Sequence, residues 1–135
     1  MKKFKKLIIA CDGESASGKS TAAKLISKKY NLLLINSGLL YRYSSRIVLK
    51  SKPKNIVFFL KKRFGKLSYK NLKKLNLHTE EISNYSAILA KNRKIRKIIN
   101  QFQMKIIRSN KKICVEGRDI ASKVLAKNPK YDLAF

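Results

Sequence analysis

The chain has few acidic residues, few cysteines and no long apolar run. Only seven of its 135 residues are Asp or Glu, against 33 Lys and Arg, so the formal net charge is +26. The two cysteines, Cys11 and Cys114, are too few for a disulfide framework and lack the spacing of a metal site. Each lies in a short apolar run, where cysteine commonly serves as a small buried residue. No run approaches the length of a membrane span, so we expect a cytoplasmic protein with no membrane partner.

Arginine is also scarce, because only seven of the 33 basic residues are Arg. The lysines are scattered with Asn and Ile through nearly every segment, which is typical of an AT-rich coding bias that places Lys on solvated faces. We therefore expect no specific nucleic-acid partner, only weak attraction to nucleic-acid phosphates.

What the chain does have is a glycine-rich loop after its first apolar run. Residues 7–11 predict a short buried strand, and residues 13–20 fit the phosphate-loop pattern G-x-x-x-x-G-K-[ST]. Gly13 and Gly18 let backbone N–H groups approach a polyphosphate, Lys19 supplies positive charge, and Ser20 offers a hydroxyl to Mg²⁺. The alternative is a Gly/Ser-rich turn without a ligand. The predicted strand, loop and helix favour an ATP site formed by Gly13, Glu14, Ser15, Ala16, Ser17, Gly18, Lys19, Ser20 and Thr21.

Strand-length and helix-length segments then alternate. One face of the helix after the loop is expected to pack on the core: Ala22, Leu25, Ile26 and Tyr30. Residues 31–35 predict a second strand and residues 36–38 a turn. The next helix carries an apolar face: Leu40, Tyr43 and Ile47. Strand, helix, strand, helix is the order of a parallel α/β sheet.

Residues 50–80 break this alternation. We interpret them as an inserted segment with a small core rather than as a nucleic-acid surface. Thr79 is the predicted N-cap of the next helix, with Glu80 and Glu81 in its first turn. That helix is marked by Ile82, Tyr85 and Leu89. A longer helix follows with an apolar stripe: Ile95, Ile98, Ile99, Phe102 and Ile106.

A third strand is predicted at residues 113–115, and it ends in the sequence Glu116-Gly117-Arg118-Asp119. In an open parallel sheet, ligands gather beyond the carboxyl ends of the strands. Gly13, Ser37 and Gly117 each follow a predicted strand, so we expect the three motifs to form one site. Glu116 either supports Mg²⁺ through water or is a surface charge at a strand end.

The motifs together resemble those of cytidylate kinases, which are nucleoside monophosphate kinases of the P-loop class. The resemblance rests on residues 13–20, 37–42, 95–96 and 117–119 in this order. It implies an α/β fold of the P-loop NTPase type, in which helices flank a parallel sheet and a monophosphate-binding subdomain is inserted. Residues 1–135 would form a single, incomplete domain, with residues 50–80 on the acceptor side. The implied reaction is ATP-dependent phosphorylation of CMP or dCMP by a monomer.

The resemblance also implies a role for each matching residue. Ser37, Arg42 and Arg118 match residues that hold the acceptor phosphate. Arg96 and Asp119 match the pair that reads the cytosine edge. Guanidinium groups suit phosphate oxygens, and a carboxylate can accept a hydrogen bond from the amino group of cytosine.

The chain departs from the family pattern in three segments, one of which is Ala121-Ser122 in place of the usual Gly-Thr after the Arg-Asp pair. Glu14-Ser15-Ala16 stands where Pro-Ala-Gly is usual. Ala87, with Ser86 beside it, stands where a base-contacting serine is usual.

Family members continue into a lid whose arginines grip the transferring phosphoryl group, and this chain has no arginine after Arg118. Lys19 and Arg118 are therefore the catalytic residues that the resemblance implies here. Residues 131–135 predict the start of a strand that has no following turn or cap, so we expect a truncated chain. Because lid arginines supply much of the rate in this reaction class, we expect these 135 residues to bind nucleotide weakly and turn over little.

Two other functions stay open. A P-loop kinase for a different nucleoside monophosphate would prefer UMP or AMP over CMP. A basic nucleic-acid-binding protein with a vestigial loop would lose DNA affinity steeply with salt, without competition from nucleotides.

Overall fold

The computed structural model describes residues 6–12, 19–117 and 133–134. The chain divides into two compact units. Residues 1–37 and 103–135 form the first, which we call the sheet unit, and residues 38–102 form the second, which we call the helical unit. The expectation of a single domain with an insertion at residues 50–80 stays a prediction.

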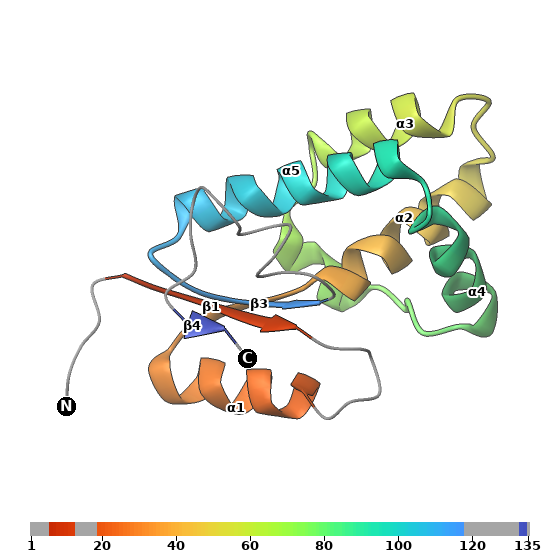
Figure 1. The fold of residues 1–135 in the computed structure, drawn as a ribbon. Coiled ribbons are helices and arrows are strands. Elements are labelled where there is room, and N and C mark those ends of the chain that lie inside the picture. Colours follow the sequence, from red (N-terminus) through yellow and green to blue (C-terminus); the bar gives the residue numbers. More distant parts are fainter. Residues whose placement is uncertain (1–5, 13–18, 118–132, 135) are drawn as a thin grey trace. The chain divides into compact units, whose positions relative to one another are not determined.

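The sheet unit is built on four parallel strands (Figure 1). Strand β1 (Leu7–Asp12) lies between β3 (Lys112–Gly117) and β4 (Leu133–Ala134), while β2 (Leu33–Asn36) pairs with the other side of β3. The resulting order is β2-β3-β1-β4. The predictions of a parallel α/β sheet and of its first and third strands are therefore confirmed.

Both central strands are buried on their two faces, as their continuous apolar sequences require. Ile9 and Cys11 of β1 belong to a core cluster with Cys114 of β3 and Ala23 of helix α1 (Lys19–Tyr30). The two sulfur atoms lie 3.6 Å apart as thiols, not as a disulfide. The interpretation of both cysteines as small buried residues is confirmed.

Helix α1 packs on the sheet through small residues. Ala23 is 0% exposed and Ser27 is 7% exposed, whereas Leu25 is 65% exposed. The predicted apolar face is therefore wrong for Leu25 and for Tyr30, which is also exposed. The helix contacts β1, β2 and β3, and small side chains at the contact let its backbone approach the sheet. The prediction is confirmed for Ile26, which packs against the core cluster.

The second strand starts later than predicted because Asn31 ends the helix before it. Asn31 has a φ of 55° and occupies the left-handed position that follows many helices. The Leu32 N–H donates to the Ser27 carbonyl at 2.8 Å and closes a Schellman motif. Strand β2 therefore begins at Leu33 rather than at residue 31.

The predicted turn at residues 36–38 is also wrong. Helix α2 (Ser37–Ser51) begins immediately after β2. Asn, Ser and Gly favour helix N-termini as well as turns, so this sequence does not distinguish the two. The predicted apolar face of the helix is confirmed, since Leu40, Tyr43 and Ile47 are all buried.

The helical unit continues with α3 (Ile56–Phe64), the 3₁₀ helix η1 (Tyr69–Lys74) and α4 (Glu80–Leu89). Leu60, Phe64 and Leu72 are buried, which confirms a small core in residues 50–80. The Phe64 ring makes edge contacts with Tyr43 at 5.7 Å and with Phe102 at 5.2 Å, measured between ring centroids.

Side-chain caps fix the starts of the later helices. The Thr79 hydroxyl accepts a hydrogen bond from the Ile82 N–H at 3.2 Å, so the predicted cap is confirmed. The Asn92 side chain accepts from Lys94 and Ile95 at the start of α5 (Arg93–Ser109). These caps satisfy N–H groups that have no partner within the helix.

Helix α5 is buried along a line of residues four apart: Ile95, Ile99, Gln103 and Ile107. Ile98, Phe102 and Ile106 of the predicted stripe are half-buried beside that line. The predicted apolar stripe is thus confirmed in part. The prediction did not include the buried polar residue Gln103. No helix within the described ranges is long and apolar enough to cross a membrane.

Candidate functional site

Three strands of the sheet unit end together at one edge. Asp12, the last residue of β1, pairs with Gly117, the last residue of β3. Asn36, the last residue of β2, pairs with Glu116. Because the strands are parallel and adjacent, the segments after β1 and β3 and the start of α2 all begin at this edge. The predicted convergence of three strand ends is confirmed, and this edge is where open α/β sheets bind ligands.

The phosphate-loop sequence connects this edge to α1. Strand β1 ends at Asp12 and α1 begins at Lys19, so the predicted strand before this sequence and helix after it are confirmed. Residues 13–18 lie outside the described residues. The first turn of α1 contains no acidic residue, so no carboxylate of that turn offsets the positive end formed by its backbone N–H groups and the helix dipole. Such an end favours phosphate.

Ser37 is held at the start of α2 by a buried amide. Its hydroxyl donates to Oε1 of Gln103 at 2.5 Å, and the two residues are 6% and 1% exposed. Both belong to the sheet unit. Sequence reasoning missed Gln103, although a polar residue in phase with Ile95 and Ile99 on an apolar stripe is a detectable signal.

Arg42 has fixed partners within the helical unit. Its Nη1 donates to the Ser83 hydroxyl at 2.6 Å and to the Leu77 carbonyl at 3.2 Å. The side chain is half-buried. A guanidinium group has five N–H donors, so these two bonds leave others for a phosphate. Arg42 is therefore positioned by its surroundings and is not a freely solvated charge.

Arg96 lies near Tyr41, the residue that precedes Arg42. Burial raises the pKa of Tyr41 above its ordinary value of 10.0, and the positive charge of Arg96 opposes that rise. Both residues are half-buried and belong to the helical unit. Arg42 and Arg96 thus share one unit with a common neighbour, Tyr41.

The other predicted acceptor residues, Arg118 and Asp119, lie outside the described residues. Ser37 belongs to the sheet unit, whereas Arg42 and Arg96 belong to the helical unit. One common cleft for all these side chains stays a prediction.

Glu116 has a buried carboxylate oxygen at the strand edge. Its Oε2 has no hydrogen-bond partner among the residues that the structure describes. An orphaned buried carboxylate oxygen is costly unless a cation or a donor meets it. Carboxylate oxygen is a ligand type that Mg²⁺ accepts directly or through water, so the donor set at this edge fits that ion.

Comparison with known proteins gives the family. The family model described as "Cytidylate kinase" matches residues 9–130. The chain belongs to the cytidylate kinase family. It is 38% identical over 137 residues to the cytidylate kinase of Mesomycoplasma hyopneumoniae strain 7448, with 90% of this chain and 58% of that relative covered.

Other curated cytidylate kinases are similarly related. That of Aquifex aeolicus strain VF5 is 34% identical over 133 residues, which cover 90% of this chain and 60% of the relative. That of Lactococcus lactis strain IL1403 is 31% identical over 145 residues, which cover 96% and 63%. The chain therefore spans about 60% of the length of these family members.

One of the departures from the family pattern falls on helix α4. Ala87 is exposed, and the neighbouring Ser86 hydroxyl donates to the Ile82 carbonyl of its own helix at 2.7 Å. Ser86 is thus engaged locally.

Removing the partner of the Ser37 hydroxyl should destabilise the sheet unit. Gln103→Leu leaves that buried hydroxyl without an acceptor, and we expect a loss of about 1–3 kcal/mol in unfolding free energy. Ser37→Ala should leave the Gln103 amide unsatisfied at a similar cost. The double variant should lose clearly less than the sum, by at least about 1 kcal/mol, in urea denaturation. Strictly additive losses would show that the two side chains do not interact.

The raised pKa of Tyr41 predicts a late phenolate titration. The folded state favours the protonated phenol of Tyr41. The contribution of this phenol to stability is therefore present below pH 10 and is lost as the pH rises through the pKa of Tyr41 in the folded state. In an ultraviolet titration, one phenolate transition should be absent from the Tyr41→Phe variant. In the unsubstituted protein, that transition should have its midpoint above pH 10. Arg96→Gln should move that midpoint higher still, because it removes the opposing charge. A downward shift would contradict this account.

Proposed function

We propose that this chain transfers the terminal phosphoryl group of ATP to CMP or dCMP. The observation that carries the proposal is the parallel register that ends β1, β2 and β3 at one edge, beside the phosphate-loop sequence. Family membership and the printed names of the relatives support it. In this proposal the sheet is a P-loop kinase core, and residues 50–80 belong to an inserted acceptor-binding subdomain.

ATP is proposed to bind along residues 13–21. Backbone N–H groups of the loop and of the first turn of α1 surround the phosphates, and Lys19 neutralises charge on the β- and γ-phosphates. Mg²⁺ would be held by Ser20 and, through water, by Glu116, whose buried oxygen needs a partner. When bound, the ion neutralises charge that develops on the transferring phosphoryl group.

The acceptor is proposed to bind through its phosphate and its base separately. Ser37, Arg42 and Arg118 hold the phosphate, where the fixed partners of Arg42 keep its guanidinium oriented. Arg96 and Asp119 read the cytosine edge. The acceptor's own phosphate oxygen is the nucleophile, so the protein positions and stabilises charge and needs no strong base. Arg118 also stabilises the transferred group.

A panel of acceptors tests the proposal. Formation of ADP with Mg-ATP should be faster for CMP and dCMP than for UMP or AMP. Binding titrations of the four monophosphates provide the same ranking if turnover is slow. Preference for UMP or AMP would refute cytosine recognition.

Charge-matched variants test the base-reading residue. Arg96→Ala should lower the preference for CMP over UMP by about tenfold, because one charged hydrogen bond is lost. Lys97→Ala removes the same charge from an exposed neighbour on α5 and should leave the preference unchanged. An equal effect of both variants would mean that general charge, not recognition, attracts the acceptor.

A further inference from the structure

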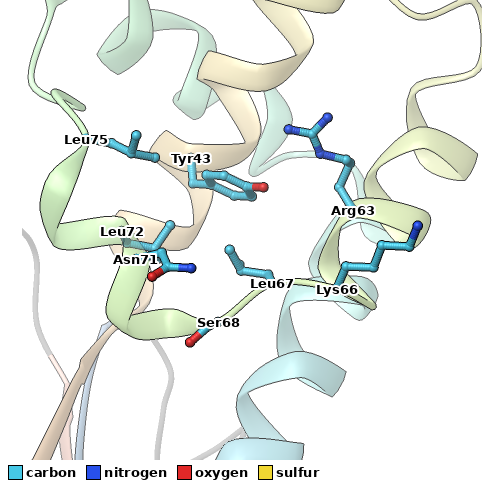
Figure 2. Close-up of a pocket in the computed structure, with 8 residues that line it drawn as sticks. All are labelled: Tyr43, Arg63, Lys66, Leu67, Ser68, Asn71, Leu72 and Leu75. Carbon is cyan, nitrogen blue, oxygen red and sulfur yellow. The ribbon is translucent and has the colours of Figure 1, made fainter.

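The helical unit contains a pocket that includes none of the residues proposed to bind ATP or CMP. Its volume is about 490 Å³, within the usual range for small-molecule sites. The side chains that line it come from α2, the end of α3, the following loop and η1 (Figure 2).

Tyr43 presents a hydroxyl group to this pocket from a side chain that is otherwise buried. The residue is only 7% exposed, and its ring is held by the edge contact with Phe64. Its hydroxyl has no hydrogen-bond partner within the described part of the chain. A phenol hydroxyl that faces a pocket can donate a hydrogen bond to a ligand or to water. Figure 2 shows the hydroxyl directed toward the side of the pocket that carries Arg63 and Lys66.

The charged side chains of the pocket are all positive. Arg63 and Lys66 contribute two cations, and none of the described residues that line the pocket is acidic. The Arg63 guanidinium lies over the Phe59 ring at 5.5 Å, which restrains it without neutralising it. A fork of guanidinium donors beside an ammonium group suits an anion with several oxygen atoms, such as phosphate.

Two further polar side chains add hydrogen-bonding capacity. Ser68 is the N-cap residue of η1, but its hydroxyl makes no capping hydrogen bond. Asn71 lies one turn later on the same 3₁₀ helix and also lines the pocket. Each of these groups can donate a hydrogen bond to an oxygen of the ligand.

The rest of the pocket is apolar, which favours a ligand with an apolar part over a simple phosphate ion. Its walls include three leucines: Leu67, Leu72 and Leu75. In Figure 2, Leu72 and Leu75 lie at the end away from Arg63 and Lys66. The pocket therefore has a cationic end and an apolar end.

We propose that this pocket binds a small organic phosphate monoester, separate from both substrates of the kinase reaction. The phosphate lies against the hydrogen-bond donors Tyr43, Arg63 and Lys66. The organic part lies against the leucines. This site shares no residue with the proposed acceptor site, so it stands even if CMP is not the acceptor.

Phenyl phosphate is a suitable probe because it combines one phosphate with one apolar ring. Titration into the isotope-labelled 135-residue protein should shift backbone amide signals of residues 63–75 saturably. Arg63→Gln should weaken binding about tenfold, and Tyr43→Phe, which keeps the ring, should weaken it severalfold. Lys62→Gln removes the same charge as Arg63→Gln from an exposed neighbour outside the pocket and should leave the affinity unchanged.

CMP and inorganic phosphate serve as comparison ligands for phenyl phosphate. CMP binding these amides more tightly than phenyl phosphate would overturn the proposal, because the pocket would then belong to the acceptor, whereas tighter binding of phenyl phosphate than of CMP would support a separate site. Equal weakening by Arg63→Gln and Lys62→Gln would overturn the proposal, since the attraction would then be that of the whole basic chain. Inorganic phosphate binding as tightly as phenyl phosphate would also overturn it.

Discussion

Replacement of Lys19 by alanine should weaken Mg-ATP binding by about tenfold to a hundredfold. The residue begins α1 directly after the loop, and its ammonium group is proposed to pair with the β- and γ-phosphates. Hydrogen bonds to charged groups contribute about 1.5–3 kcal/mol each, which corresponds to that range. Fluorescence titration with a labelled ATP analogue, followed by displacement with Mg-ATP, measures the change.

Lys24→Ala is the matched control for this experiment. Lys24 is an exposed residue of the same helix, outside the loop sequence, and its loss changes the net charge equally. Its affinity should stay within twofold of the unsubstituted protein. If both variants lose affinity alike, ATP is attracted by the total charge of +26 and not by a phosphate loop.

The second large effect concerns stability. Ile99→Ala should lower the free energy of unfolding by about 2–5 kcal/mol, because Ile99 is 0% exposed and a cavity would replace its side chain. Ile88→Ala is the same substitution at a residue that is 60% exposed, and we expect a change within about 0.5 kcal/mol. Chemical denaturation followed by circular dichroism measures both. Similar losses for the two variants would contradict the packing described for the helical unit.

The sequence predicted the sheet well because its strands carry strong, simple signals. β1 and β3 are continuous apolar runs, as expected for strands covered on both faces. The glycine pattern after β1 and the polar residues after β3 then indicated the edge of the sheet where the strands end together. The Thr79 cap was also predictable, since a threonine before acidic residues favours a helix start.

Helix faces were less predictable where packing uses small or polar residues. α1 contacts the sheet through Ala23 and Ser27, which a search for large apolar residues passes over. Gln103 is buried at the centre of an apolar line because Ser37 satisfies its amide, and that pairing joins residues 66 positions apart. Local periodicity contains no information about such a long-range partner.

The pocket in the helical unit could not be predicted from sequence at all. Residues 50–80 read as loosely patterned lysines and leucines, and the interpretation stopped at a small core. The position of Tyr43 beside Arg63 and Lys66 depends on how α2, α3 and η1 pack, and not on any motif.

Mapping of the two substrates on the same protein tests the central claim most directly. In amide spectra of the isotope-labelled chain, Mg-ATP should shift signals of residues 12–21 and 116–117, while CMP should shift those of residues 37–42 and 96. The two sets should respond to their own nucleotide even when the other is present. If CMP and Mg-ATP instead displace each other from the same signals, or if CMP leaves residues 37–42 and 96 unchanged, this protein does not bind a donor and an acceptor as proposed.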